Sequence, residues 1–134
     1  MPSFWKEPRR AIDKVAKKRQ AKRDDKRDRD EVRQRDRYRC RLCGRRTSTV
    51  HEDKRRGAGG TVSLKNSLLL CDAYEGGLCH PLTGTRWITP VMANGAEEFD
   101  ANGDLVFEMT EATAKKVFEH RARPAHVRIV WRAN

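Results

Sequence analysis

Long hydrophobic runs are absent from this 134-residue sequence, and aromatic residues make up only 7% of it. A bilayer-spanning helix needs about 20 apolar residues, so we expect no contact with a membrane. The first residues pass directly into charged positions without the apolar segment of a secretory signal, which predicts an intracellular, cytoplasmic protein. Because 37% of the residues are charged, the chain cannot bury a large core along its whole length. One small domain with a solvated or partner-bound part is expected.

Positive charge is what the sequence has in excess. Lysine and arginine number 30 against 19 acidic residues, a formal net charge of +11. The excess is uneven, because the residues up to Arg39 carry a net +8 and those from Cys40 onward a net +3. Such a balance indicates a polyanionic partner.

The first 36 residues are predicted to form a basic arm. No glycine or proline interrupts residues 9–39, and the scattered apolar positions make no continuous stripe. This pattern predicts a long, solvated, partly helical segment. Its basic blocks, such as 17–19, 22–23 and 33–39, favour contact with phosphates. The alternative is a solvated helix without a ligand, because four aspartates neutralise much of its middle.

The remainder of the chain predicts an α+β fold, with a module over residues 37–90 and a strand-helix-strand extension over 91–134. Thr110 is suited to cap a helix that runs from Glu111 to about His120. An Asn102-Gly103 turn precedes the strand at 105–107. Strands or short apolar runs are expected at 47–51, 67–70, 87–91, 105–107 and 127–131.

Four cysteines lie in two pairs. Cys40 and Cys43 are two residues apart and are followed by Gly44, as in a zinc knuckle. Cys71 and Cys79 are separated by a longer loop whose two glycines let it fold back. A redox pair at Cys40 and Cys43 is the main alternative, but it needs a buried strand before it and gives the second pair no role. The spacing therefore predicts one structural zinc ion held by all four cysteines.

A further order of residues surrounds these pairs: Val50-His51-Glu52, Gly59-Gly60, Asn66, Leu70-Cys71 and Cys79-His80. In this order the segment from about Arg37 to Trp87 resembles the HNH endonucleases, in particular small phage-type and bacterial members with a four-cysteine zinc site. The resemblance implies a ββα-metal (His-Me finger) core. It also implies metal-dependent hydrolysis of DNA phosphodiester bonds, with Mg²⁺ or Mn²⁺ as the catalytic cofactor.

The resemblance implies three catalytic residues, His51, Asn66 and His80. His51 activates the water, Asn66 braces the loop and orients the base, and His80 holds the catalytic metal with Glu52 as a further ligand. Counting back from Gly59-Gly60 instead makes Glu52 the base and His51 the ligand. We prefer His51 as the base, because an imidazole titrates near pH 6.5 and an ordinary glutamate near pH 4.3.

One departure from the family keeps a second function open. Many relatives have another metal-binding histidine at the position of Gly84, where this chain has no side chain. The alternative is therefore a catalytically inactive, zinc-stabilised nucleic-acid-binding module.

Basic residues next to the motif are expected to contact the DNA backbone. Trp87 and Trp131 are expected to pack against the small sheet rather than stack on bases, and His120 and His126 receive no role. The candidate backbone contacts are Arg45, Arg46, Lys54, Arg55, Arg56 and Arg86.

Overall fold

The computed structural model describes residues 6–52, 60–91 and 104–133, with side chains from residue 13 onward. It confirms the α+β class, with an N-terminal helix, two small sheets and a buried cysteine cluster. The predicted Asn102-Gly103 turn lies outside the described residues. The elements are α1 (Lys6–Arg35), β1 (Val50–Glu52), β2 (Ser67–Leu69), η3 (Ala73–Glu75), α2 (Cys79–Leu82), β3 (Ile88–Pro90), β4 (Leu105–Thr110), α3 (Glu111–Val117) and β5 (Val127–Arg132).

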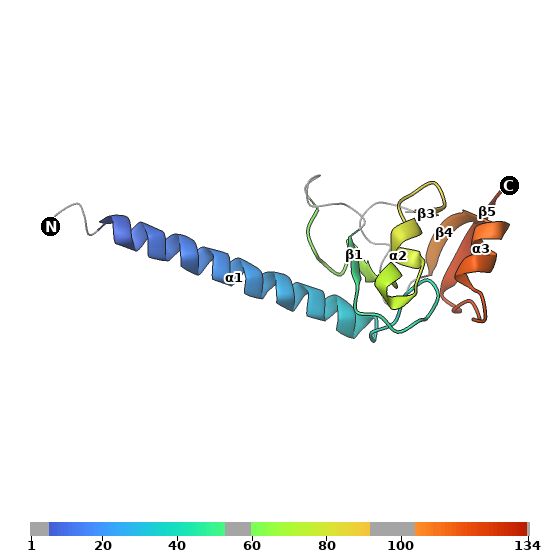
Figure 1. Cartoon of the computed structure of the whole chain (residues 1–134), viewed down its shortest axis with the longest axis horizontal. Coiled ribbons are helices and arrows are strands. Elements are labelled where there is room, and N and C mark those ends of the chain that lie inside the picture. The colour runs from blue at the N-terminus through green and yellow to red at the C-terminus, as the bar shows by residue number, and fades with distance from the viewer. Residues whose placement is uncertain (1–5, 53–59, 92–103, 134) are drawn as a thin grey trace.

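Helix α1 extends away from the rest of the molecule, with the N-terminus at its far end (Figure 1). The segment predicted to be partly helical is one continuous helix of 30 residues. Near its C-terminal end Val32 is fully buried and packs with Val62 and Leu69. Beyond the helix, Arg37 and Tyr38 adopt left-handed backbone angles, with φ of 56° and 55°. This turn directs the chain into the segment that holds the first two cysteines.

Strands β1 and β2 form an antiparallel pair in which His51 lies opposite Leu68. Strand β1 begins later than the predicted 47–51. The threonines before it are engaged elsewhere, because the hydroxyls of Thr47 and Thr49 donate to Glu75 Oε1 over 2.6 and 3.0 Å. Strand β2 begins at Ser67 as predicted and is buried along its whole length.

The second sheet has the order β3-β4-β5, with β3 antiparallel and β5 parallel to β4. Helix α3 connects β4 to β5, and Thr110 caps it as predicted by accepting a hydrogen bond from Thr113 N. The helix ends at Val117, earlier than expected. The packing predicted for the two tryptophans is wrong, because Trp87 and Trp131 are 46% and 55% exposed.

One hydrophobic cluster runs through both sheets. It joins Leu68 and Leu70 near β2 to Phe107 and Met109 on β4, together with the four cysteines. The module predicted at 37–90 and the extension at 91–134 thus contribute to the same core. Among the described helices, none has the length and apolar character that a membrane crossing requires.

Candidate metal centre and histidine pair

The four cysteines come together from three parts of the chain. Cys40 and Cys43 lie in the turn that follows α1, Cys71 follows β2, and Cys79 begins α2. All four are buried, and their sulfur atoms lie within 4.8 Å of one another. The Sγ atoms of Cys43 and Cys71 are 3.6 Å apart. Sulfurs that surround one zinc ion tetrahedrally at about 2.3 Å are separated by about 3.8 Å, so this cluster fits a structural zinc ion.

The electrostatics of the cluster also suit a cation. Hydrogen bonding from Cys40 lowers the pKa of the Cys43 thiol to about 7, and it holds the pKa of Cys71 far below its usual range. Burial raises the pKa of Cys40, and hydrogen bonding to its neighbours raises that of Cys79. The four thiols are therefore coupled, and ionisation of Cys43 and Cys71 is favoured by hydrogen bonds from their neighbours. A bound divalent ion stabilises thiolates in such a cluster.

A glycine makes the second half of the cluster feasible. Gly77 lies in the loop between Cys71 and Cys79, and a Cβ atom at this position would be 2.5 Å from both Cβ and Sγ of Cys71. No side chain fits there without moving the cysteine. Gly76 beside it has a φ of 75° and ends η3. The loop thus folds back, as we predicted from its two glycines.

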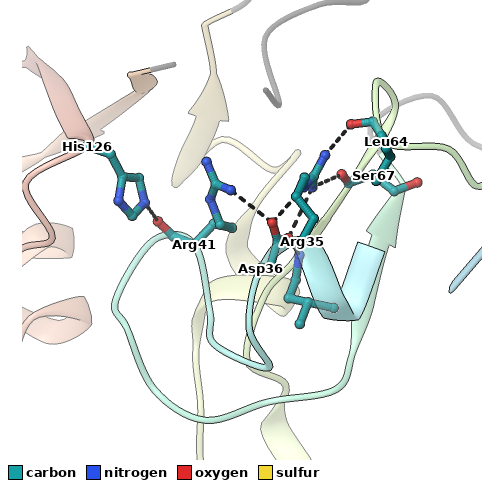
Figure 2. Close-up of polar contacts among 7 residues, drawn as sticks. Arg35, Asp36, Arg41, Leu64, Ser67 and His126 are labelled. Carbon is teal, nitrogen blue, oxygen red and sulfur yellow. Dashed lines mark hydrogen bonds and ion pairs between the residues drawn. The ribbon is translucent and has the colours of Figure 1, made fainter. Parts of the chain in front are cut away.

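A buried carboxylate connects α1, the cysteine turn and β2 (Figure 2). Asp36 has a fully buried side chain. It accepts hydrogen bonds from Arg35 Nε at 2.7 Å, from Arg41 Nη1 at 2.9 Å and from Leu69 N at 2.9 Å. Arg35 also donates to the carbonyls of Leu64 and Ser67. This network fixes the start of the cysteine turn against the strand that leads to Cys71.

The C-terminal part is linked to the same turn. The ring of His126, through Nε2, lies 2.7 Å from the carbonyl oxygen of Arg41 (Figure 2).

Glu75 ties η3 to the residues before β1 and forms a capping box with Asp72. Although burial opposes ionisation of Glu75, hydrogen bonds from Thr47 and from the Asp72 backbone lower its pKa.

The two histidines of the predicted site are brought together. His51 on β1 is buried, His80 on α2 is partly buried, and their Nδ1 atoms are 3.2 Å apart. The rings meet edge to face at a centroid distance of 5.3 Å. His80 N donates to the carbonyl of Cys71 over 2.8 Å, so the histidine next to the cysteine cluster is held by one of the four cysteines. The histidine pair and the cysteine cluster therefore share α2.

Glu52 and Asn66 lie away from this contact. Side chains alternate along a strand, and Glu52 Oε1 lies 3.9 Å from Arg29 of α1 while the adjacent His51 meets His80. Asn66 donates from Nδ2 to the carbonyl of Thr61 over 2.9 Å, and its backbone N–H donates to Ser63 Oγ. Asn66 thus spans the turn that leads into β2, which is the kind of contact expected of a loop brace.

The structure describes three of the six basic residues that are candidates for contact with DNA. Arg46 and Arg86 are exposed, and Arg45 is half-buried with Nη1 3.4 Å from the carbonyl of Glu75. The guanidinium of Arg86 lies 4.6 Å from the ring centroid of Trp87. The remaining three, Lys54, Arg55 and Arg56, lie outside the described residues.

Sequence reasoning missed the residues that position the cluster. Asp36 stands in a run of charges with no feature to separate it from the half-buried aspartates before it. The contacts of Arg41 and His126 join residues 85 positions apart, which no local pattern reveals. Only the spacing of Gly76 and Gly77 gave a signal for the loop geometry.

Comparisons of the chain with protein-family models, with curated proteins and with solved structures found no match.

Proposed function

We propose that this protein is a metal-dependent endonuclease that hydrolyses DNA phosphodiester bonds and uses a zinc ion on its four cysteines as a structural clasp. The observation that carries the proposal is the contact between His51 and His80, which lie 29 residues apart in the sequence. Two antiparallel strands and a short helix supply these side chains directly beside the cysteine cluster. A module that only binds DNA has no need for this pair.

The chemistry follows from the two imidazoles. Phosphodiester hydrolysis needs a base for the attacking water and a cation for the charge that grows on the phosphate. His51 is buried on its strand and is the base in this proposal. His80 is the residue that would hold the catalytic metal, and the metal, when bound, polarises the phosphate. Asn66 keeps the loop before β2 in place.

Two contacts bear on the arrangement proposed around the metal. Glu52 Oε1 lies 3.9 Å from Arg29, so in this proposal the two imidazoles are the main groups of the site and Glu52 is a secondary ligand. A separation of 3.2 Å between two ring nitrogens suits a hydrogen bond, and it is also near the spacing of two ligands on one transition metal ion. Imidazole nitrogens bind Mn²⁺ and later transition metals better than Mg²⁺. We therefore expect faster cleavage with Mn²⁺ than with Mg²⁺.

The test is cleavage of supercoiled plasmid by the zinc-loaded chain with Mn²⁺, with Mg²⁺ and without either ion. His51→Ala is expected to lower the rate by about 10² to 10⁴, with no recovery at high Mn²⁺, because the proton acceptor is gone. His80→Ala is expected to recover part of its rate at high Mn²⁺, because the loss of one ligand lowers the affinity for the metal more than it lowers the rate of the chemical step. Both variants should retain zinc and fold normally.

Glu52→Gln is the matched control, since it changes the neighbour of His51 on the opposite face of the strand. It is expected to keep most of the activity. A near-complete loss in Glu52→Gln, together with rescue of His51→Ala by metal, would mean that base and ligand are reversed. Absence of cleavage with every ion tested would contradict the nuclease proposal.

One observation favours the second candidate, a zinc-stabilised nucleic-acid-binding module without catalysis. Within the described part of the chain, the cysteine cluster is the only group of three or more metal-ligating side chains. The histidine pair offers two protein ligands, and Gly84 adds none. A module of this kind would bind plasmid DNA with unchanged affinity in His51→Ala and His80→Ala, and the unmodified protein would not cleave DNA with any metal ion.

A further inference from the structure

Helix α1 has two halves with different electrostatics. Residues 24–35 contain five basic and five acidic residues and are neutral. They are also paired along the helix, as Asp25 with Arg29 and Asp30 with Arg33, each at 2.9 Å. Residues 13–23 contain six basic residues and one acidic residue. All of them are exposed, and no side chain in this described stretch forms an ion pair.

Five of the six cations of residues 13–23 lie on one face. With 3.6 residues per turn, five cations occupy about half of the circumference, and no acidic residue lies among them. The other half holds Asp13, Lys17 and Gln20, and Gln20 donates to Asp24 over 3.0 Å. We define the cationic face by its five residues: Lys14, Lys18, Arg19, Lys22 and Arg23.

This face repels itself in the free protein. Lys14, Lys18 and Lys22 follow one another at intervals of four residues, as do Arg19 and Arg23. Like charges at this spacing are neighbours on a helix and destabilise it. A polyanion bound along the face would remove the repulsion. The neutral half, in contrast, carries no net charge, and most of its charged side chains pair along the helix or with the rest of the fold.

The neutral half holds the cationic face at a set position relative to β1. Arg33 Nε donates to the carbonyl of Ser48 over 3.0 Å, and Arg29 lies 3.9 Å from Glu52, the residue after His51. At 1.5 Å per residue, the cationic face begins about 10 Å from Arg29 along the helix and ends about 22 Å from it. Figure 1 shows α1 projecting clear of both sheets over this length.

We infer that the cationic face of α1 binds the phosphate backbone of duplex DNA beyond the cleavage site, while the neutral half serves as a rigid spacer. The choice of DNA rests on the proposed function. The face spans about 14 Å, over which a duplex presents about eight phosphates. A membrane surface is disfavoured, because an interfacial helix needs an apolar face and Val15 is the one large apolar side chain of this stretch. The inference restricts the DNA-binding part of the predicted arm to the cationic face. Arg33 and Arg35 are left out, because their guanidinium groups donate to backbone carbonyls within the fold.

The test measures binding of the full zinc-loaded chain to a 30-base-pair DNA duplex as a function of salt, with Ca²⁺ in place of Mn²⁺. Replacing Lys14, Lys18 and Lys22 with Gln is expected to weaken binding. The slope of log K against log salt should fall by about 0.9 per lost phosphate contact, or about 2.7 in all. The matched control replaces the exposed Lys115, Lys116 and Arg123 with Gln and changes the net charge equally. Its slope should stay the same.

A finer pair compares Lys17→Gln with Lys18→Gln, because these neighbours lie on different sides of the helix. Only Lys18→Gln should lower the slope. Equal slopes for both triple variants would overturn the inference. The inference would also be overturned if the triple lysine variant lost binding only to duplex RNA, or only to vesicles of phosphatidylcholine and phosphatidylserine, and not to duplex DNA. Because binding is measured without cleavage, an inactive protein with a normal slope change would contradict the nuclease proposal and leave the cationic face established.

Discussion

The two ends of α1 show two ways of using charge. Along residues 13–23 the charged side chains are exposed and stabilise no other part of the fold. At the other end the charges of Arg35, Asp36 and Arg41 are largely buried and link three segments of the chain. Residue types of the same kind are thus left exposed to solvent at one end and link parts of the fold at the other.

The difference lies in solvation. An exposed ion pair contributes little to stability, because water and salt screen it. A buried charge is costly unless it is paired and hydrogen-bonded, and removal of one partner leaves the other stranded. Asp36 joins Arg35 at the end of the helix to Arg41 of the cysteine turn and to Leu69 of β2, so this end of the helix is tied to the segments that hold the cysteines.

Loss of the metal centre is expected to have the largest effect. Cys79→Ser, or removal of zinc with a strong chelator, should abolish cooperative unfolding of the body, because structural zinc sites contribute about 10 kcal/mol or more of apparent binding free energy. Elemental analysis should give one zinc per chain in the unmodified protein and none in the variant. A cooperative melt of the zinc-free protein at an unchanged temperature would contradict this expectation.

The same site sets the direction of the pH dependence. Protons compete with zinc for the thiolates, so the stability that zinc provides is present at neutral pH and is lost as the pH falls. Zinc release followed by a colorimetric chelator should therefore increase on acidification.

The charges at the two ends of α1 can be compared directly by substitution. Asp36→Ala should lower the free energy of unfolding by about 3–5 kcal/mol, because Arg35 and Arg41 remain buried without their carboxylate. Asp28→Ala removes a half-buried carboxylate 3.7 Å from Arg27 and should change it by less than about 0.5 kcal/mol. Urea unfolding measures both, and similar values for the two would remove the distinction drawn between these regions.

Two glycines extend the comparison to the loops. Gly77→Ala should lower stability by about 1–3 kcal/mol and weaken zinc retention, since its Cβ would lie 2.5 Å from Cys71. Gly84→Ala meets nothing within 4 Å, although its φ of 84° is unfavourable for alanine. It should therefore cost about 1 kcal/mol without affecting zinc. Equal zinc loss from both variants would show that the close contact with Cys71 is unimportant.

Local patterns predicted much of this molecule. The helix at the N-terminus follows from good helix formers without glycine or proline, and the cap at Thr110 from its side chain and its place before a helical segment. The four-cysteine cluster follows from the pairing of the cysteines and the two glycines between the last two. These features depend on neighbours in the sequence, or on the strong preference of thiolates for one metal ion.

Other features depend on distant residues. The sequence pattern puts β1 at 47–51, yet contacts from Thr47 and Thr49 to Glu75 move its start to Val50. The exposure of Trp87 and Trp131 was missed because Ile88, Phe107 and Met109 fill the core between the sheets. Side-chain volume decides which apolar residue is buried, and no periodicity in a short strand reports it.

By itself the sequence determined the excess of positive charge, the helical arm, the α+β class and the two cysteine pairs, because composition and short spacing encode them. Only the tertiary structure decided that His51 meets His80 while Glu52 meets Arg29. It also decided that Asp36 is a fully buried link while the similar Asp28 is only half-buried. The physical reason is that burial and pairing arise between segments far apart in the chain. They decide how much each of two identical side chains contributes to the free energy of unfolding.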